Sequence, residues 1–441
     1  HAISDRLFMR FFTTYTNYDY DFQGSTSEMD LEWISRIQDA GLRVDFSFIP
    51  DQKNVFEFGY TSNFQWFQPG KAIGTGTIGT GAKVEQDITM SRRQGFVNVV
   101  YFSNEHKLFG HRIELRYGLR FTRFDNVGPT TLYQVDEQYN LIDEEGTEIP
   151  SGQFFHHRYG WEPRLGLSFL VTPELSLKTS YSRTLQYVHL LSFSSAGSPM
   201  EIWIPSGPSI LPQASHQISA GIFANLFNKD YEASVEVFYK HLDNVLDFKE
   251  HPNLLLYDKI ETELRFGKGK SYGVEFLLKR NTGALSGWIS YTWSRSFRNI
   301  PGVNKNQTYR APSDRPHNIN IVVFYDISPR LQASLNWVYA TGMPITLPEG
   351  RYWFYNELIP VYTERNSYRM ADYHRMDASL NIRLGKPGRR WKHSLNVSVY
   401  NLYARKNPWA INYRLNPAGE QYLEMTYLFS IVPSITWNFS F

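Results

Sequence analysis

Residue-by-residue alternation of apolar and polar side chains is the feature of this chain that most restricts its fold. In a β-strand, residues i and i+2 share a face, so alternation produces one apolar and one polar face. In the clearest example, the C-terminal stretch, one face carries Tyr427, Phe429, Ile431, Ile435, Trp437, Phe439 and Phe441. The pattern recurs around residues 56–65, 231–240, 331–339 and 375–384. It predicts an all-β chain in which helix is nearly absent.

The distribution of charge indicates which face meets which solvent. Charged residues such as Arg375, Asp377 and Arg383 fall on polar faces, where we expect them to line or bridge a wet lumen wall. A Lys or Arg facing lipid at mid-membrane costs roughly 2–4 kcal/mol, and the apolar faces carry none. The aromatic content of 16%, with 29 Tyr and 31 Phe, fits the girdles of an outer-membrane barrel. No apolar run approaches the roughly 18 residues of a spanning helix, so a barrel is the remaining route across a membrane.

Short polar turns alternate with long loops, which is the known asymmetry between the periplasmic and outer ends of such barrels. The sequence predicts one domain, 1–441, forming an antiparallel meandering transmembrane β-barrel wall of about sixteen strands. The expected strands lie near 5–22, 28–49, 54–67, 87–103, 110–124, 159–172, 174–186, 213–227, 231–248, 269–281, 285–298, 316–326, 330–341, 374–385, 392–404 and 426–441.

Composition and motif context exclude several kinds of chemistry. The chain has no cysteine, and its net charge of +2 gives no argument for a nucleic acid partner. Gly74, Gly76 and Gly79 fit G-x-G-x-x-G, but no helix is expected after them, so a flexible outer loop is the better interpretation. Gly269, Ser271 and Gly273 fit G-x-S-x-G but run straight into a strand, which a nucleophile elbow does not do. We expect neither catalysis nor a cofactor.

A metal site on an outer loop is one hypothesis for His156 and His157, because they lie near an acidic run at 136–148. Adjacent residues of a strand point to opposite faces, which weakens joint ligation. Acidic runs are more often solvated loops. We therefore predict no metal site.

Several short stretches, in order along the chain, carry a family resemblance. They are Gly118-Leu119-Arg120, Glu162-Pro163-Arg164-Leu165, Tyr181-Ser182-Arg183, Gly273-Val274-Glu275, the YRAPSDRPHN run at Tyr309–Asn318, Asn401-Leu402-Tyr403 and the aromatic terminus Phe441. Together they resemble the TonB-dependent outer-membrane receptor and transporter family, particularly its Bacteroidota branch.

The resemblance implies a parent barrel of about 22 strands with a plugged lumen, of which this chain would be the C-terminal part without the N-terminal plug and about the first six strands. It implies location in a Gram-negative outer membrane and energised import of a scarce nutrient, such as a siderophore, glycan, peptide or cobalamin, without enzymatic activity. The partners would be outer-membrane lipid, the TonB complex through a plug not present in this chain, and a surface lipoprotein or other barrel subunits.

Two alternatives stay open: a passive porin of sixteen strands, and a transporter-like barrel that is a structural subunit of an outer-membrane complex. Pairing between the strands near 5–22 and 426–441 would favour the porin. An open or otherwise paired edge would favour the transporter.

The candidate site residues are aromatic and basic. On the outer loops, the candidate ligand contacts are Trp203, Arg351, Trp353, Phe354 and Tyr355, because exposed aromatic rings can stack on sugars, aromatic siderophores or peptides. Packing of the loops against each other is the alternative. In the last strand, Trp437, Phe439 and Phe441 are expected to form the signal that the barrel-assembly machinery recognises.

Overall fold

The computed structural model describes residues 1–25, 29–77, 83–191, 201–250, 252, 258–354, 357–384, 391–416 and 421–440. Almost every regular element in these ranges is a strand. The helical elements described are two short 3-10 turns, η1 (Ile260–Glu263) and η2 (Asn304–Asn306). Within the same ranges, no helix is long and apolar enough to cross a membrane.

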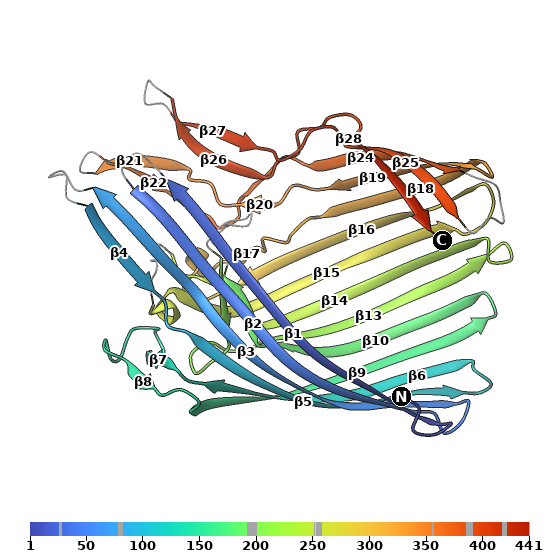
Figure 1. Ribbon diagram of the computed structural model, residues 1–441, viewed down its shortest axis with the longest axis horizontal. Helices are drawn as coiled ribbons and strands as arrows, with labels where there is room; N and C mark the ends of the chain where they lie inside the picture. Colours follow the sequence, from blue (N-terminus) through green and yellow to red (C-terminus); the bar gives the residue numbers. More distant parts are fainter. Residues whose placement is uncertain are drawn as a thin grey trace.

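One antiparallel sheet curves around an open interior (Figure 1). It contains 18 strands, of which β4 (Lys83–Thr89) and β17 (Tyr309–Arg310) are short additions beside the wall. The wall strands, paired in chain order, are β1 Leu7–Ser25, β2 Met29–Phe48, β3 Asn54–Thr77, β5 Arg93–Leu108, β6 Ile113–Val127, β9 Phe154–Thr172, β10 Leu175–Gln186, β13 Gln213–Leu226, β14 Tyr231–Phe248, β15 Leu264–Arg280, β16 Leu285–Asn299, β18 His317–Ser328, β19 Leu331–Ala340, β24 Tyr373–Leu384, β25 Lys392–Tyr400 and β28 Val432–Ser440. The predicted all-β meander of about sixteen strands is confirmed.

The outer end of the wall differs from the prediction around residues 68–86, where we expected a flexible loop. Strand β3 continues to Thr77, and its last residues pair with β4, from Lys71 opposite Thr89 to Thr77 opposite Lys83. Gly74 and Gly76 therefore lie in a β-ladder, and Gly79 is outside the described residues. Backbone pairing does not depend on large side chains, so the glycine-rich composition did not prevent a strand.

The C-terminal strands are shorter than predicted. Strand β25 ends at Tyr400 because Asn401, with φ of 55°, turns the chain away from the ladder. Strand β28 begins at Val432, so Tyr427, Phe429 and Ile431 precede it instead of belonging to it. Trp437 and Phe439 lie on β28 with 62% and 57% of their surface exposed, and Phe441 is outside the described residues.

The long loops contain small two-stranded sheets that the sequence did not predict. These are β7 Thr130–Leu132 with β8 Thr147–Ile149, β11 Val188–Leu191 with β12 Ile202–Pro205, β20 Pro344–Ile345 with β23 Tyr368–Arg369, β21 Gly350–Phe354 with β22 Glu357–Val361, and β26 Ala410–Leu415 with β27 Gln421–Thr426. They lie at the end of the wall opposite the short turns (Figure 1).

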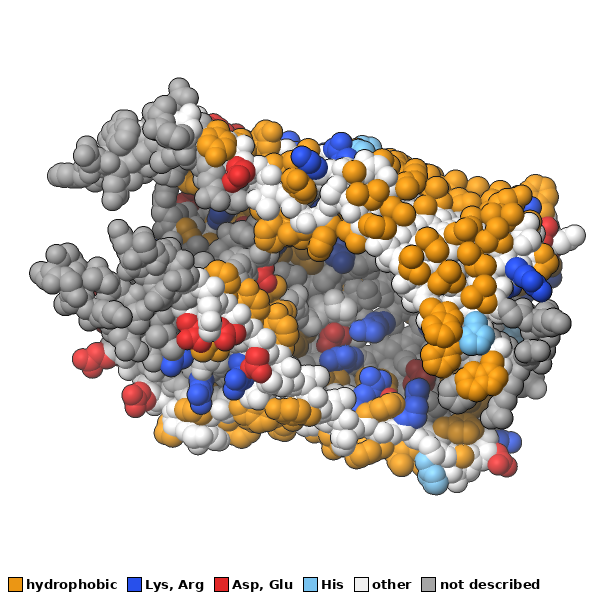
Figure 2. Space-filling view, turned by 45° about the horizontal axis from the view of Figure 1, so that its top comes forward, with side chains coloured by type: hydrophobic (Ala, Val, Ile, Leu, Met, Phe, Trp, Pro, Cys, Tyr) orange, Lys and Arg blue, Asp and Glu red, His pale blue; other side chains and the backbone are white. Residues whose placement is uncertain are grey.

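The register assigns the two faces of the wall. On β14, Val235, Val237 and Tyr239 share the apolar face and are 41–49% exposed. Glu236 points the other way and lies directly opposite Glu275 of β15. Figure 2 shows apolar side chains over the outer surface and charged ones inside the hollow. The apolar face is therefore the lipid-facing face.

The two edges of the sheet do not meet within the described residues. Strand β1 pairs only with β2, and β28 pairs only with β25. Strand β1 also runs from the short-turn end towards the long-loop end, as expected, since Leu7 lies opposite Phe48. The ladder that a closed sixteen-stranded porin requires is thus not seen in this part of the chain.

A hydrophobic core lies inside the wall at its long-loop end. Its buried members are Trp33, Met90, Leu191, Ile202, Ile204, Ile210, Phe248, Ile260 and Leu264. Strand β12 lies between wall strands β10 and β13 in the chain, but it contacts β3 and β5, which are farther along the wall. The β11–β12 hairpin therefore folds back along the inner side of the wall and narrows the outer end of the lumen.

Candidate functional site

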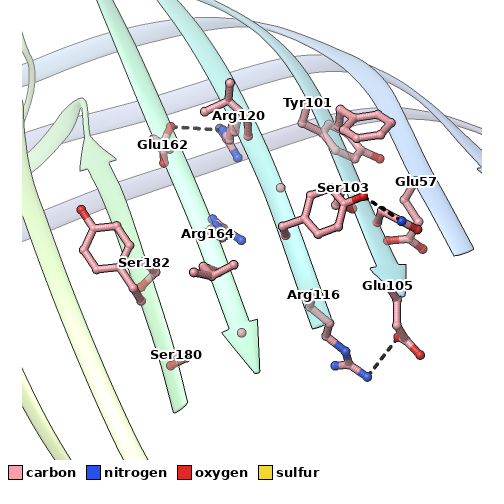
Figure 3. A pocket seen from close by; sticks show the side chains of 18 of the residues that line it. Glu57, Tyr101, Ser103, Glu105, Arg116, Arg120, Glu162, Arg164, Ser180 and Ser182 are labelled. Atoms are coloured by element: carbon pink, nitrogen blue, oxygen red, sulfur yellow. Dashed lines mark hydrogen bonds and ion pairs between the residues drawn. The ribbon is translucent and has the colours of Figure 1, made fainter. Parts of the chain in front are cut away.

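A cavity of about 710 Å³ lies against the wall formed by β3, β5, β6, β9 and β10 (Figure 3). Alternation places every second residue of each strand on its polar side. The lining includes Arg43, Glu57, Tyr101, Ser103, Glu105, Arg116, Arg120, Glu162, Arg164, Ser180 and Ser182. Three of the segments that carry the family resemblance, Gly118-Leu119-Arg120, Glu162-Pro163-Arg164-Leu165 and Tyr181-Ser182-Arg183, thus contribute to one lumen surface.

Glu162 of β9 is held tightly inside this surface. Its carboxylate accepts hydrogen bonds from Thr122 Oγ1 at 3.0 Å and from the Leu185 N–H at 3.3 Å, and Arg120 Nε lies 3.3 Å away. Only 4% of Glu162 is exposed. A carboxylate with its acceptor sites occupied in this way fixes the wall and is not available to a ligand.

Other lumen charges are also neutralised locally. The carboxylate of Asp45, 2% exposed, accepts hydrogen bonds from Arg43 Nε at 2.8 Å and from the Tyr101 hydroxyl at 2.6 Å. Arg116 lies 3.1 Å from Glu105 and 2.6 Å from Glu114. The Asp45–Tyr101 contact joins β2 to β5 across β3, and the Arg116–Glu105 pair joins β6 to β5, so these contacts hold the polar side of the wall together.

Arg164 differs from its neighbours. Within the described residues, no hydrogen-bond acceptor or carboxylate contacts its guanidinium, which is exposed to the cavity. Figure 3 shows it between β6 and β10 with no interaction drawn to it. A guanidinium offers a fork of donors that matches a carboxylate or a similar anion. Arg164 is therefore the lumen cation best placed to bind an anionic solute.

A second cluster of polar side chains connects the outer loops to the wall. The Ser91 N–H and hydroxyl donate to Asp258 at 2.6 and 2.7 Å, and the Tyr133 hydroxyl donates to the same carboxylate at 3.1 Å. Arg93 forms a nearly buried ion pair with Glu261 at 2.5 Å. Burial, reinforced by Asp258, raises the pKa of Tyr133 to about 12, so this phenol stays a donor at all physiological pH values.

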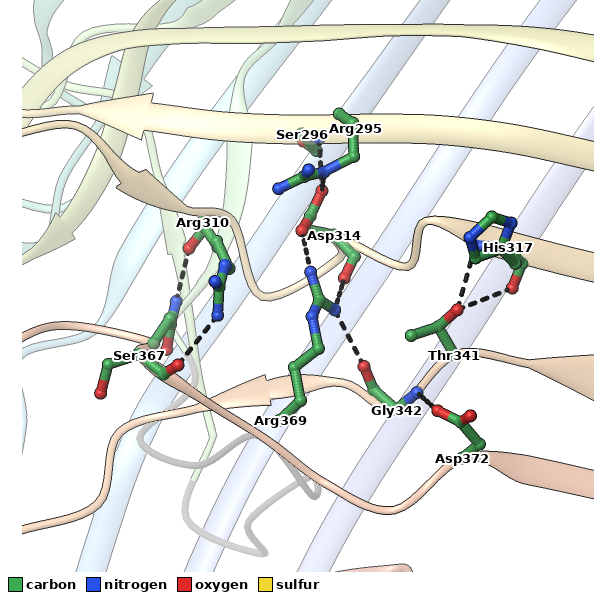
Figure 4. Close-up of polar contacts among 11 residues, drawn as sticks. Arg295, Ser296, Arg310, Asp314, His317, Thr341, Gly342, Ser367, Arg369 and Asp372 are labelled. Atoms are coloured by element: carbon green, nitrogen blue, oxygen red, sulfur yellow. Dashed lines mark hydrogen bonds and ion pairs between the residues drawn. The ribbon is translucent and has the colours of Figure 1, made fainter.

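A third cluster of polar side chains surrounds Asp314, which belongs to the YRAPSDRPHN segment (Figure 4). Its carboxylate accepts hydrogen bonds from Arg295 Nε at 3.1 Å and from the Ser296 N–H at 2.7 Å, and it binds Arg369 of β23. Arg310 donates to the Ser367 carbonyl at 2.8 Å. The YRAPSDRPHN segment therefore joins one outer loop to another, and none of its residues lines the cavity.

The structure separates the predicted ligand contacts. Trp203 is half-buried on β12, opposite Leu190. Arg351, Trp353 and Phe354 lie on β21, in a different two-stranded sheet, and their side chains are outside the description. Tyr355 lies wholly outside the described residues. Ligand contact by these residues stays a prediction.

The remaining sequence motifs have structural positions. Ser271 lies in the middle of β15, as expected for a strand. His156 and His157 lie opposite Asn126 and Asp125 of β6, so they occupy opposite faces of β9. Arg375 bridges the wall as expected, since it pairs with Asp377 at 2.9 Å and lies over the Tyr400 ring at 4.2 Å.

Sequence reasoning missed the lumen surface itself, although a signal was present. Arg116 and Arg120 lie four residues apart on one strand, and Glu162 and Arg164 lie two residues apart on the next wall strand. Such charges share the polar face by simple alternation. The register between strands decides which of these charges pair, and Arg164 is left without a partner among the residues that the structure describes.

A sixteen-strand antiparallel wall with an apolar exterior and a charged interior defines an outer-membrane β-barrel. The chain belongs to the TonB dependent receptor-like, beta-barrel family, whose model matches residues 1–402. No curated protein sequence matches the chain.

Solved structures of receptors and transporters share this fold. The ferric-catecholate import receptor Fiu of E. coli K12 matches with a TM-score of 0.59 and 13% identity over 100% of this chain and 62% of its own. The ferric citrate transporter FecA matches with a TM-score of 0.64 and 12% identity, over 100% and 60%. The ferric yersiniabactin uptake receptor FyuA of Yersinia pestis gives 0.61 and 14%, over 99% and 59%. The chain thus spans about three fifths of the length of these structures.

Proposed function

We propose that this chain forms part of the barrel wall of a TonB-dependent importer, and that its substrate is an anionic metal chelate of the siderophore type. The observation that carries the proposal is Arg164, which lies on the polar lumen surface of a barrel of this family and has no partner in the part of the chain that the structure describes. Iron–siderophore chelates commonly present carboxylate or catecholate oxygens, which a guanidinium binds well. The names of Fiu, FecA and FyuA, each of which refers to a ferric ligand, support the same class.

Energy coupling in this proposal comes from the TonB complex, acting through a plug that the family resemblance implies. The chain itself contributes binding and passage and no bond-breaking chemistry. Among the residues that the structure describes, β1 and β28 do not pair with each other, which does not support the passive porin, because a porin needs these strands to close a ring. Glycans, peptides and cobalamin stay within the range of nutrients to be tested.

The proposal is tested by uptake of radiolabelled iron chelates into cells that carry the whole protein. We expect saturable uptake of an anionic ferric chelate that disappears when TonB is inactivated. Uptake that persists without TonB and rises linearly with concentration would indicate passive diffusion and overturn the proposal.

Arg164→Gln tests the lumen residue in the same assay. Losing one charge-assisted hydrogen bond should raise the concentration for half-maximal uptake about tenfold. Arg280→Gln, on the lipid-facing side at the short-turn end, is the matched control and should leave uptake unchanged. Alanine variants of Trp203 and Trp353 extend the test to the proposed outer-loop ligand contacts.

A further inference from the structure

One row of cross-strand partners runs across the outer part of the wall and carries mostly basic side chains. In order from β10 to β17, each directly opposite the next, its members are Arg183, His216, His241, Lys270, Phe297 and Arg310. Lys268 is the next residue on the same face of β15. We call these seven residues the basic row.

The basic row lies on the lipid-facing side of the wall. His241 follows Tyr231, Ala233, Val235, Val237 and Tyr239 on the apolar face of β14. Tyr239 follows Tyr231 by eight positions, which is about 20 Å along the membrane normal for a strand tilted by about 40°. This is close to the height of the apolar band of such barrels. His241 and the residues beside it therefore lie just beyond the hydrocarbon, at the level of the outer headgroups.

The charges of the basic row are only partly neutralised by the protein. Arg183 donates to the Trp161 carbonyl and Arg310 to the Ser367 carbonyl, both at 2.8 Å, and neither acceptor is charged. The carboxylate that faces the group is Asp243, 3.1 Å from the His241 ring and opposite Lys268. Lys268 and Lys270 are exposed, and the described residues offer their ammonium groups no hydrogen-bond acceptor or ion-pair partner.

Other outward-facing basic residues near the outer end of the wall are neutralised by the protein. Arg36 of β2 pairs with Asp19 of β1, Arg123 of β6 pairs with Asp125 at 2.9 Å, and Arg295 of β16 pairs with Asp314 at 3.1 Å. Lys268 and Lys270 project from one face of β15 two residues apart, and Arg183 and Arg310 add positive charge to the same row, whereas Asp243 is the acidic residue opposite Lys268. The basic row therefore carries a net positive charge that an anion outside the protein would balance.

We propose that the basic row binds the phosphate groups of an anionic lipid in the outer leaflet. Lys268 and Lys270 would contact the phosphates, and the aromatic rings of Tyr239 and Tyr272, next on the same face towards the hydrocarbon, would pack beside the start of the acyl chains. Charge complementarity selects an anion, and the position above the tyrosines selects one that is held in the membrane. This site is on the outer surface of the wall and is independent of the lumen and of the proposed substrate.

The test measures lipid binding to the whole protein purified in detergent, with diphosphorylated lipid A as the probe and native mass spectrometry as the readout. We expect the Lys268→Gln/Lys270→Gln variant to bind this lipid at least tenfold more weakly than the unmodified protein. Lys268→Arg/Lys270→Arg keeps both charges and should restore binding. Arg36→Gln, which removes a paired basic residue elsewhere on the same rim, is the matched control and should bind normally.

Two further measurements on the unmodified protein test the proposal even if the double Gln variant does not fold. Lipid A stripped of its phosphates should bind at least tenfold more weakly, and added salt should weaken binding of the phosphorylated form. Equal binding of both lipids, or an unchanged double Gln variant, would overturn the proposal. Competition by inorganic phosphate at concentrations comparable to the lipid would show a site for a soluble anion and would also overturn it.

Discussion

The fully buried carboxylate of Asp314 binds Arg295 Nε at 3.1 Å, which joins an outer loop to wall strand β16. The same carboxylate binds Arg369 of β23, so one side chain holds three segments of the chain together. Asp314→Asn removes the charge and leaves two guanidinium groups without their partner. We expect a loss of about 3 kcal/mol in unfolding free energy, measured by denaturant unfolding in detergent.

Asp326→Asn is the control for this change, because Asp326 is exposed at a short turn and accepts a hydrogen bond from Gln332. Its effect should stay within about 0.5 kcal/mol. Equal losses for the two variants would show that the Asp314 contacts add nothing to the wall.

The assignment of faces makes a prediction for adjacent residues of β14. Val235 lies on the apolar face midway between Tyr231 and Tyr239, and Ser234 lies on the lumen face. Val235→Lys should destabilise the inserted barrel by about 2–4 kcal/mol, whereas Ser234→Lys should have little effect. Unfolding from lipid bilayers measures both. The opposite order would mean that the two faces are exchanged.

The inward-folded hairpin should weaken in acid because of His189 on β11. The imidazole is 3% exposed and lies 3.1 Å from the Ser206 hydroxyl, and burial lowers its pKa from 6.5 to about 4. In the opened hairpin, the ring would regain its ordinary pKa and bind a proton below about pH 6.5. The hairpin is therefore fully stable above that pH and loses stability as the pH falls to about 4, by up to roughly 3 kcal/mol.

Hydrogen exchange of the β11 and β12 amides at pH 7 and pH 5, corrected for intrinsic rates, measures this loss. His189→Gln keeps a hydrogen-bonding side chain without a titratable ring, so its exchange should show no such pH dependence. Identical pH behaviour of the two proteins would exclude His189 as the cause.

Asn401 should be more important than its place after a strand suggests. It is fully buried, has φ of 55°, and its side-chain amide donates to the Arg405 and Ser430 carbonyls at 2.8 and 3.1 Å and accepts from the Arg405 N–H at 3.0 Å. Asn401→Ala should cost about 3 kcal/mol, because it leaves buried groups unsatisfied and strains the backbone.

Asn401→Gly separates these two effects in the same unfolding measurement. Glycine adopts a positive φ without strain, so it should recover about 1 kcal/mol of the loss but not the hydrogen bonds. Full recovery in the glycine variant would show that only the backbone conformation matters at this position.

The wall was predictable because one physical rule governs it. In segments such as 231–248, period-two alternation and the absence of lipid-facing charge specify both the strand and its faces, and β14 has the predicted bounds. Beyond the membrane no lipid contacts the strands, so a strand there does not need alternating apolar and polar side chains. Alternation therefore does not predict such a strand. The residues up to Thr77 of β3 extend the ladder in a segment of glycine and threonine, which carried no alternation to detect.

For the candidate site, the sequence predicts which residues share the lumen face but not which of them contact each other. Alternation places Arg164 and Glu162 on one polar face, but it cannot tell that Thr122 and Arg120 bind Glu162 while Arg164 has no partner among the described residues. Those contacts join residues about 40 positions apart and depend on strand register. The inward fold of the β11–β12 hairpin escaped prediction for the same reason, since Ile202 and Ile204 have their neighbours on distant strands.

The lengths of the first three wall strands have a consequence at the cell surface. Strands β1, β2 and β3 have 19, 20 and 24 residues, whereas about 9–11 residues cross the membrane in a tilted strand. In Figure 1 these strands extend far beyond the middle of the sheet on the long-loop side. About nine residues of β1, ten of β2 and fourteen of β3 therefore stand clear of the bilayer as a ridge at least about 20 Å high. The first three wall strands thus carry the sheet out past the membrane on one side of the barrel mouth, where other wall strands such as β10 and β13 are shorter.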